Sequence, residues 1–334
     1  MKYFPEQHDR FAELLEAVKD RPTAVLGHMR PDGDCIGSQV ALTRVLLQTG
    51  VDAVAVNRHP APRDIAPFVG DTPLLLWDEF KMDGHVSINV DCADPIRVSQ
   101  KLVDIFPETL ANIDHHISNP SYAKINIVES QSAATAELLA GLFFDFGLPV
   151  DATTAQALYV GIATDTGQFR FPSTTERVFK ICSQLMDHGA SPSEAAKYLF
   201  ENERFNKLAL LQRFLASLRL ELEGRVCIGR LPLTAYESTH AWREEAEGFV
   251  DYARDIQGVE IGILLEEYDD GTLKGSLRAK DPHYRVDQIA KRFGGGGHAC
   301  AAGFNVDTNI ETFYLDIVAA LAAHLAEVQP IAQA

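Results

Sequence analysis

Residues 23–48, TAVLGHMRPDGDCIGSQVALTRVLLQ, decide the fold class of this protein. The segment begins with a short apolar run of the kind that forms a buried strand, and we expect this strand to end at His28. A polar turn leads to Gly33, and the pattern from about Ile36 to Gln48 is helical, with Gly50 closing the helix. A strand, a tight turn and a helix in this order indicate a β-α-β unit and therefore a parallel sheet.

The same alternation continues on both sides of this segment. An amphipathic helix is predicted at 11–18, strands at 51–56, 85–90 and 109–113, and a helix at 133–146. Residues 175–220 have helical patterns only, whereas later residues predict strands at 225–229, 259–266 and 272–279, and helices at 286–293 and 311–328. We therefore predict an α/β protein with an N-terminal, mostly parallel-sheet domain at 1–188, a helical connector at 189–220 and a smaller α/β C-terminal domain at 221–334.

Composition and charge narrow the functional classes. The 334 residues include 46% hydrophobic and 23% charged residues, as in an ordinary globular protein. The net charge of −17 disfavours binding to long duplex DNA or to an anionic membrane, because both need many Lys and Arg contacts. The five cysteines are scattered, so neither a disulfide framework nor a thiolate zinc site is expected. With no signal-like segment and no apolar stretch long enough to cross a membrane, we predict a cytoplasmic protein.

Asp and His side chains follow predicted strand ends in four separate segments, at 27–34, 89–91, 112–116 and 161–167. The carboxyl ends of parallel strands share one edge of a sheet, which is where ligands normally bind. Carboxylates and imidazoles crowded at such an edge need positive charge among them. A mixed oxygen and nitrogen set suits Mn²⁺, Mg²⁺ or Fe²⁺ better than a structural zinc. The sequence therefore predicts a site for two divalent cations.

Each segment taken alone has a simpler explanation. Asp32-Gly33 and Asp165-Thr-Gly are both typical of turns, and Asp91 after a strand could cap a helix. Cys35 and Cys92, which neighbour the candidate ligands, are interpreted as small buried residues rather than catalytic ones. The metal site is favoured because four strand ends, one sheet edge and one ligand chemistry coincide.

In order and spacing, the four segments resemble the DHH family of phosphoesterases, which is named for the motif seen here as Asp114-His115-His116. The C-terminal segment 294–303, GGGGHACAAG, looks like the glycine-rich signature of the associated C-terminal domain. The chain is similar to the short, two-domain nanoRNase branch. That branch degrades very short oligonucleotides and often dephosphorylates 3′-phosphoadenosine 5′-phosphate (pAp).

The resemblance implies roles for the residues of the four segments. Two divalent cations would bind, Mn²⁺ in preference to Mg²⁺ or Fe²⁺, with Asp91 bridging them. The remaining ligands of the first would be His28 and Asp32, and those of the second would be Asp34, His115 and Asp165. In the catalytic roles, Asp114 would orient a histidine and His116 would face the substrate.

The C-terminal domain would contribute substrate contacts. A guanidinium such as that of Arg278 can fork onto a phosphate or stack on a base. Consecutive glycines expose backbone N–H groups that can cradle a phosphate, so we predict contacts from Gly295, Gly296, Gly297 and His298. The simpler explanations are a surface ion pair for Arg278 and a flexible loop for the glycines.

The resulting hypothesis is a metal-dependent phosphodiesterase that hydrolyses very short oligonucleotides to 5′-mononucleotides and also acts on pAp. Two alternatives stay open at this point: a phosphodiesterase for cyclic or linear dinucleotides, and a non-catalytic nucleotide-binding protein. The sequence leaves the preferred substrate, the direction of digestion and the metal undecided. It also leaves open whether the apolar helices bury a homodimer interface.

Overall fold

The computed structural model describes residues 2–81 and 84–328, which form two compact units divided between Asn202 and Glu203. The division lies inside the stretch 189–220 that the sequence predicts to be a connector. Of the predicted C-terminal domain, residues 329–334 lie outside the described part of the chain. No helix of the described residues is both long enough and apolar enough to cross a membrane.

Unit 1, residues 2–202, is built on a six-stranded sheet in the order β3-β2-β1-β4-β5-β6, with every strand pair parallel. The strands are β1 (Thr23–Leu26), β2 (Ala53–Asn57), β3 (Leu74–Leu76), β4 (Val86–Val90), β5 (Ala111–Asp114) and β6 (Ile125–Val128). Strands β1 and β4 are buried along their whole length, as expected for central strands covered on both faces. The predicted parallel sheet is confirmed.

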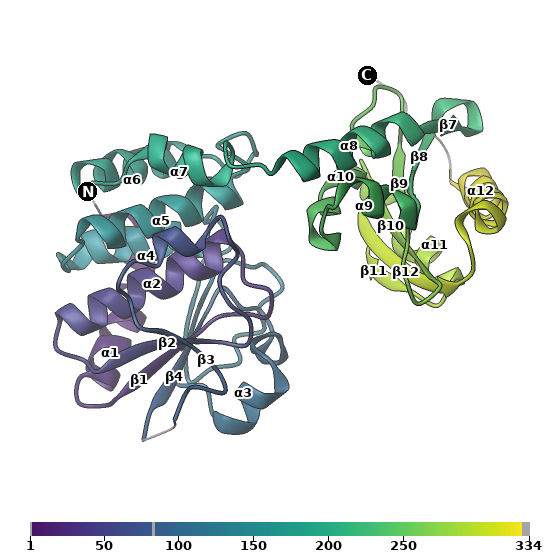
Figure 1. Ribbon diagram of the computed structural model, residues 1–334. Helices are drawn as coiled ribbons and strands as arrows, with labels where there is room; N and C mark the ends of the chain where they lie inside the picture. The colour runs from purple at the N-terminus through teal and green to yellow at the C-terminus, as the bar shows by residue number, and fades with distance from the viewer. Residues whose placement is uncertain (1, 82–83, 329–334) are drawn as a thin grey trace. The chain divides into compact units, whose positions relative to one another are not determined.

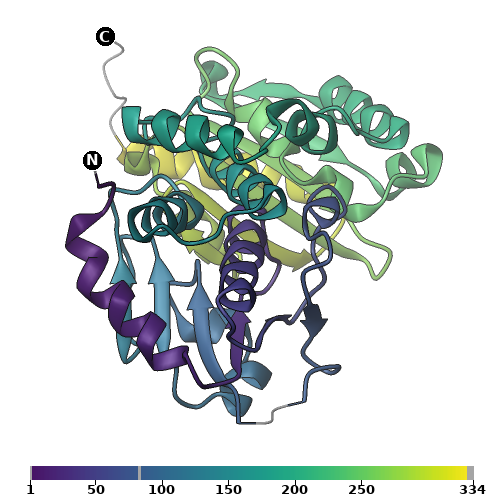
Figure 2. The ribbon, with the colours of Figure 1, turned by 90° about the vertical axis from the view of Figure 1, so that its left-hand side faces the viewer.

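The helices of unit 1 cover the sheet unequally (Figures 1 and 2). They are α1 (His8–Val18), α2 (Gly33–Gln48), α3 (Gln100–Ile105), α4 (Thr135–Phe146), α5 (Ala152–Asp165), α6 (Glu176–Asp187) and α7 (Pro192–Leu199). Helix α2 packs on β1 and β2, α4 packs on β5, and α5 lies against both helices as a further layer. The opposite face of the sheet is covered by α3 and the short helical turn at 95–98, over a smaller core that includes Leu26, Val56 and Leu102.

One element of unit 1 differs from the sequence prediction. Asp165, expected at the end of a strand, is instead the last residue of helix α5. Ten of the fourteen residues of α5 are buried, because the helix lies among α2, α4, α6 and α7. A helix that is apolar on nearly all sides has no 3.6-residue pattern, so its sequence resembles that of a buried strand.

Unit 2, residues 203–328, contains a second six-stranded sheet in the order β11-β12-β10-β9-β8-β7, in which only β8 and β9 pair in parallel. Its strands are β7 (Arg219–Glu221), β8 (Val226–Leu231), β9 (Ile261–Glu267), β10 (Thr272–Ala279), β11 (Gly296–His298) and β12 (Ala301–Asp307). Its helices are α8 (Phe205–Ser217), α9 (Leu233–Thr239), α10 (Phe249–Arg254), α11 (Val286–Arg292) and α12 (Ile310–Glu327).

The four glycines at 294–297 are more regular than the flexible loop considered from the sequence. Gly296, Gly297 and His298 form β11, which pairs antiparallel with β12 at the edge of the sheet. A Cβ atom at Gly295 would lie 2.1 Å from the backbone oxygen of Gly303, so only glycine allows these two segments to approach so closely.

Candidate metal centre

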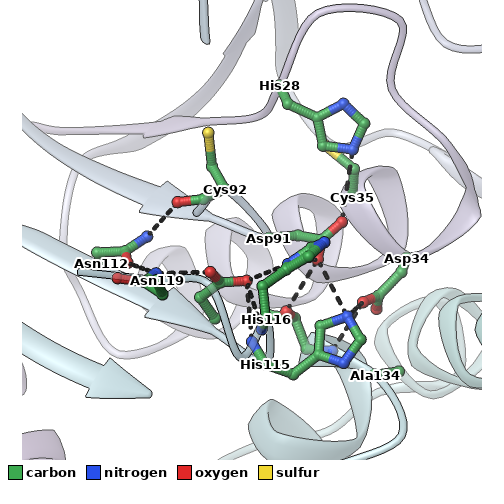
Figure 3. Close-up of polar contacts among 12 residues, drawn as sticks. His28, Asp34, Cys35, Asp91, Cys92, Asn112, His115, His116, Asn119 and Ala134 are labelled. Atoms are coloured by element: carbon green, nitrogen blue, oxygen red, sulfur yellow. Dashed lines mark hydrogen bonds and ion pairs between the residues drawn. The ribbon is translucent and has the colours of Figure 1, made fainter. Parts of the chain in front are cut away.

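The carboxyl edge of the unit 1 sheet gathers imidazole and carboxylate side chains (Figure 3). His28 follows β1, Asp91 follows β4, and Asp114 ends β5, so parallel pairing places them at one edge. The first turn of α2 adds Asp34, and the end of α5 adds Asp165. The structure thus brings together every candidate of the four segments: His28, Asp32, Asp34, Asp91, Asp114, His115, His116 and Asp165.

Asp91 lies at the centre of this cluster. Its Oδ2 is 3.5 Å from His28 Nε2, and its Oδ1 is 3.6 Å from both His115 Nε2 and His116 Nδ1. The Thr135 hydroxyl donates a hydrogen bond of 3.2 Å to Oδ1. The backbone φ of Asp91 is 53°, a left-handed value that costs energy for most residues and is best tolerated by Asn and Asp. The strained backbone is held in place and directs the carboxylate into the cluster.

His28 is oriented for ligand binding. Its Nδ1 lies 3.0 Å from the carbonyl oxygen of Met29, so Nδ1 carries the proton and Nε2 faces the carboxylates. Nε2 is 3.7 Å from Oδ2 of Asp32, the N-cap residue of α2. A backbone carbonyl that fixes one imidazole nitrogen while the other faces acidic groups is typical of metal-binding histidines.

His115 repeats the arrangement on the other side of Asp91. Its Nδ1 lies 3.2 Å from the carbonyl oxygen of Ser132. Its Nε2 lies 3.2 Å from Asp165 Oδ2 and 3.8 Å from Asp34 Oδ2. Burial lowers the pKa of His115, but contact with Asp165 and the charges nearby outweigh burial and raise the pKa to about 10. The carboxylates around His115 therefore create a negatively charged environment in which a divalent cation can replace the proton.

Asp34 is almost fully buried, at 1% exposure, at the junction of α2 and α4. Its carboxylate accepts the backbone N–H groups of Thr135 and Ala136, at 2.7 and 2.8 Å, at the start of α4. Burial raises the pKa of Asp34 well above its usual range, and the charges of Asp91 and Asp165 raise it further. Ionised carboxylates at this density need positive charge between them.

These donors fit divalent cations. Three overlapping groups of potential ligand atoms each lie within 4.8 Å of one another: His28, Cys35 and Asp91; Asp91, His115 and His116; Asp34, His115 and Asp165. The groups share Asp91 and His115, which suits two neighbouring ions. Carboxylate oxygens with neutral imidazole nitrogens match the ligand preferences of Mn²⁺ and related cations. The Cys35 thiol is buried beside His28, and burial raises its pKa to about 11.

Asp114 belongs to a hydrogen-bond network next to the cluster rather than to the three ligand groups. Its Oδ1 lies 2.7 Å from His116 Nδ1, and it also accepts the backbone N–H of His115. Its Oδ2 accepts a hydrogen bond of 2.5 Å from Asn119 Nδ2, which also donates to Asn112 Oδ1. The sequence interpretation gave no role to Asn112, Asn119 or Thr135, although the two asparagines flank the Asp-His-His motif.

We expect Asn119→Ala to lower kcat by about 10–100-fold, the usual effect of losing a partner that orients a site residue. Without Asn119, Asp114 loses the donor to one carboxylate oxygen and holds His116 less firmly. Steady-state kinetics with a dinucleotide substrate measure this, and KM should change less than kcat.

Asn126→Ala is the matched control for Asn119→Ala. The side-chain amide of Asn126 accepts from the backbone N–H of Ala123 and donates to its carbonyl, and so it has no part in holding Asp114. Its replacement should leave kcat within about twofold. An unchanged kcat in Asn119→Ala would remove this residue from the positioning network.

Comparison with known proteins supports one family. The model of the DHH family, N-terminal domain, matches residues 22–162, and that of the DHHA1 domain matches residues 232–326. The chain is 31% identical over 293 residues to the bifunctional oligoribonuclease and PAP phosphatase NrnA of Thermus thermophilus, covering 87% of this chain and 86% of that protein. The chain belongs to the DHH family. Asp165 lies three residues beyond the end of the first matched segment.

Solved structures share the DHH-family fold. The crystal structure of an exopolyphosphatase-related protein from Bacteroides fragilis superposes with a TM-score of 0.84 at 22% identity, covering 96% of both chains. A structure of exonuclease RecJ bound to manganese has a TM-score of 0.54 at 17% identity, covering 98% of this chain and 97% of that one. At these identities the likeness concerns the fold alone.

In unit 2, two of the predicted substrate residues, Arg278 and His298, share one face of the sheet. Arg278 on β10 is opposite Ala301 on β12, and Ala301 is opposite His298 on β11. Residues in register across neighbouring strands point to the same face, so Arg278 and His298 are presented together. Arg278 Nε lies 4.0 Å from Asp251 Oδ1, and Nη1 donates to the carbonyl of Leu277.

Proposed function

We propose that this protein is a metal-dependent phosphoesterase that hydrolyses very short oligonucleotides to 5′-mononucleotides and also hydrolyses pAp to AMP. The observation that carries the proposal is the acidic and imidazole cluster around Asp91, in which His28 and His115 each turn Nε2 toward carboxylates. The substrate class follows from kinship with the oligoribonuclease and PAP phosphatase of Thermus thermophilus.

Two divalent cations, Mn²⁺ in preference to Mg²⁺ or Fe²⁺, are proposed to bind with Asp91 as the shared ligand. His28 and Asp32 complete one site, and Asp34, His115 and Asp165 complete the other. Bound cations of this kind polarise a phosphoryl group and activate a water molecule for attack. The protein's own contribution is to fix these ligands through the Met29 and Ser132 carbonyls and the start of α4.

His116 and Asp114 are proposed as the catalytic pair. Contact with Asp114 raises the pKa of His116 and outweighs the opposing effect of burial, so the protonated imidazole is favoured relative to that of a free histidine. In the protonated form, Nδ1 donates to Asp114 and the proton on Nε2 is available to a phosphoryl oxygen of the substrate. Hydrogen bonds to charge that develops during reaction are among the largest contributions to catalysis.

Arg278, Gly295, Gly296, Gly297 and His298 are proposed to bind the part of the substrate that is not cleaved. We expect Arg278→Ala to raise KM about tenfold with kcat within about twofold, because a guanidinium that only binds substrate contributes equally to ground and transition states. Initial-rate kinetics on a dinucleotide measure the two constants.

Arg219→Ala is the control for Arg278→Ala, since Arg219 is an arginine on β7, at the far edge of the same sheet. Its replacement should leave both constants unchanged. An unchanged KM in Arg278→Ala would exclude this residue from substrate binding.

The proposed function is tested by Mn²⁺-dependent hydrolysis of a 5′-labelled RNA dinucleotide and of a 24-mer, followed on a gel. Rapid cleavage of the dinucleotide with little cleavage of the 24-mer is the expected result. Efficient shortening of the 24-mer would point to a general exonuclease. Absence of cleavage of both would direct attention to pAp and cyclic dinucleotides, and to the non-catalytic alternative if these are also left intact.

A further inference from the structure

Four cations near the metal centre have no acidic partner in the part of the chain that the structure describes. The chain has a net charge of −17, and unit 1 contains ion-paired cations such as Arg44 and Arg177 as well as unpaired ones such as Lys19 and Arg63. Among the described residues, no carboxylate oxygen lies within 4.0 Å of the side-chain nitrogens of Arg30, Arg58, Arg97 or Lys101. We call these four residues the cationic rim. What distinguishes these four residues from the other unpaired cations of unit 1 is their position near the strand ends where the candidate metal ligands gather.

The fold places the cationic rim at the same edge of the sheet as the metal centre. Arg30 follows β1 two residues after His28, and Arg97 lies in the loop that follows Asp91 and β4. Arg58 follows β2, the neighbour of β1 on its other side. Because all these strands are parallel, their carboxyl ends meet at one edge. Arg30 and Arg97 therefore come from the segments that also supply His28 and Asp91, and Arg58 comes from the neighbouring strand end. Lys101 lies in the first turn of α3, just after the helical turn that contains Arg97.

Specific contacts hold the rim in position. The backbone N–H of Met29 donates to the carbonyl of Arg97 at 2.6 Å, which joins the loop after β1 to the loop after β4. The N–H of Arg30 donates to His59 Nδ1 at 3.1 Å, which joins the loop after β1 to the loop after β2. Arg30 adopts a left-handed φ of 54°, an unfavourable conformation that this bond supports.

The side chains of the other two cations meet on one aromatic ring. The guanidinium carbon of Arg58 lies 5.0 Å from the centre of the Trp77 ring, and Lys101 Nζ lies 3.9 Å from it. Trp77 directly follows β3, and its backbone N–H donates to the carbonyl of Asn57 at the end of β2. Cation–π contacts hold charged groups in place without neutralising them.

We propose that Arg30, Arg58, Arg97 and Lys101 form a phosphate-binding subsite that holds a second phosphate group of the substrate, one that is not cleaved. This inference rests on the proposed function and refines its substrate class. The preferred substrates are nucleotides that carry a phosphomonoester in addition to the scissile phosphate: pAp, and dinucleotides with a 5′-phosphate. Guanidinium groups suit such a group because they bind phosphate oxygens in a bidentate manner.

The first test compares two dinucleotides that differ only in the second phosphate, pApA and ApA. The double variant Arg30→Ala, Arg97→Ala should lower kcat/KM for pApA about tenfold and leave kcat/KM for ApA within about twofold. The matched control is Arg10→Ala, Lys180→Ala, which removes the same charge from two ion-paired residues on α1 and α6 and should leave both values unchanged. An equal loss for pApA and ApA, or no loss for either, would overturn the subsite.

A binding measurement tests the subsite without hydrolysis. The chain has two tryptophans, and in the variant Trp242→Phe only Trp77, which contacts Arg58 and Lys101, remains. The fluorescence of Trp77 is followed while pAp is added in the presence of EDTA. The dissociation constant of pAp should rise about tenfold in the Arg30→Ala, Arg97→Ala background and fall at low salt in the parent. Equal affinity in the two backgrounds would overturn the subsite. If neither dinucleotide is hydrolysed but this titration behaves as expected, the proposed function fails and the subsite stands.

Discussion

Replacing Asp91 by Asn is expected to lower hydrolysis about 100- to 1,000-fold while leaving the fold intact, because a single electrostatic group at a reacting centre is worth about 10²–10³ in rate. Asp91 is the one carboxylate that lies within 3.6 Å of the imidazoles of His28, His115 and His116. Asn keeps the shape of the side chain and tolerates the left-handed backbone at this position. The variant therefore removes charge without removing packing.

Thermal unfolding separates loss of metal binding from loss of structure. At a cation concentration of about 100 times Kd, binding to the native state adds about 2.7 kcal/mol to the free energy of unfolding. For a unit of this size that corresponds to a rise in Tm of about 5–10 °C. The wild-type protein should show this rise with Mn²⁺, and Asp91→Asn should lose most of it.

Without metal, Asp91→Asn should unfold at nearly the same temperature as the wild type. Removal of the charge relieves repulsion with buried Asp34 and at the same time weakens the contacts with His28 and His115. Asp64→Asn, at an exposed position, is the control and should change neither Tm nor activity. Hydrolysis by Asp91→Asn within tenfold of wild type would exclude a central role for this carboxylate.

The site residues that directly follow or end the strands of the parallel sheet could be predicted from the sequence. A short apolar run followed by a polar turn correctly places His28 after β1, and the same pattern places Asp91 after β4. Asp114 closes β5, as the run at 109–113 indicates. In each case the side chain is fixed by its own strand, so local sequence contains the information.

The features of the site that could not be predicted from the sequence depend on contacts between distant segments. The hydrogen bond from Thr135 to Asp91 joins residues 44 positions apart, and nothing local to Thr135 indicates it. Asp165 was misplaced because α5 is buried on nearly all sides and lacks an amphipathic pattern. Strand β3 has only three residues and is too short for alternation to be read from the sequence, and the edge strand β6 was also not predicted.

A side chain at Gly37 is expected to disrupt the packing of helices α2 and α5. Helices α2 and α5 approach so closely that a Cβ atom at Gly37 would lie 2.4 Å from the backbone oxygen of Ala157 and 3.2 Å from the nitrogen of Gly161. Because these are backbone atoms of a helix, no side-chain rotation can make room. Helix α2 carries Asp34 and helix α5 ends at Asp165, so this contact also sets the distance between two candidate ligands.

We therefore expect Gly37→Val to lower the free energy of unfolding by about 3 kcal/mol, at the upper end of overpacking effects. A helix displacement of about 1 Å can cost about 10²-fold in rate, so the folded variant should also lose most of its activity. Urea unfolding followed by circular dichroism, with Mn²⁺-dependent hydrolysis at equal folded concentration, measures both effects. Leu47→Val introduces the same residue at a more exposed position of α2 and should change stability by less than about 1 kcal/mol. If Gly37→Val matched this control in both measurements, the close contact between α2 and α5 would not be what positions Asp34 and Asp165.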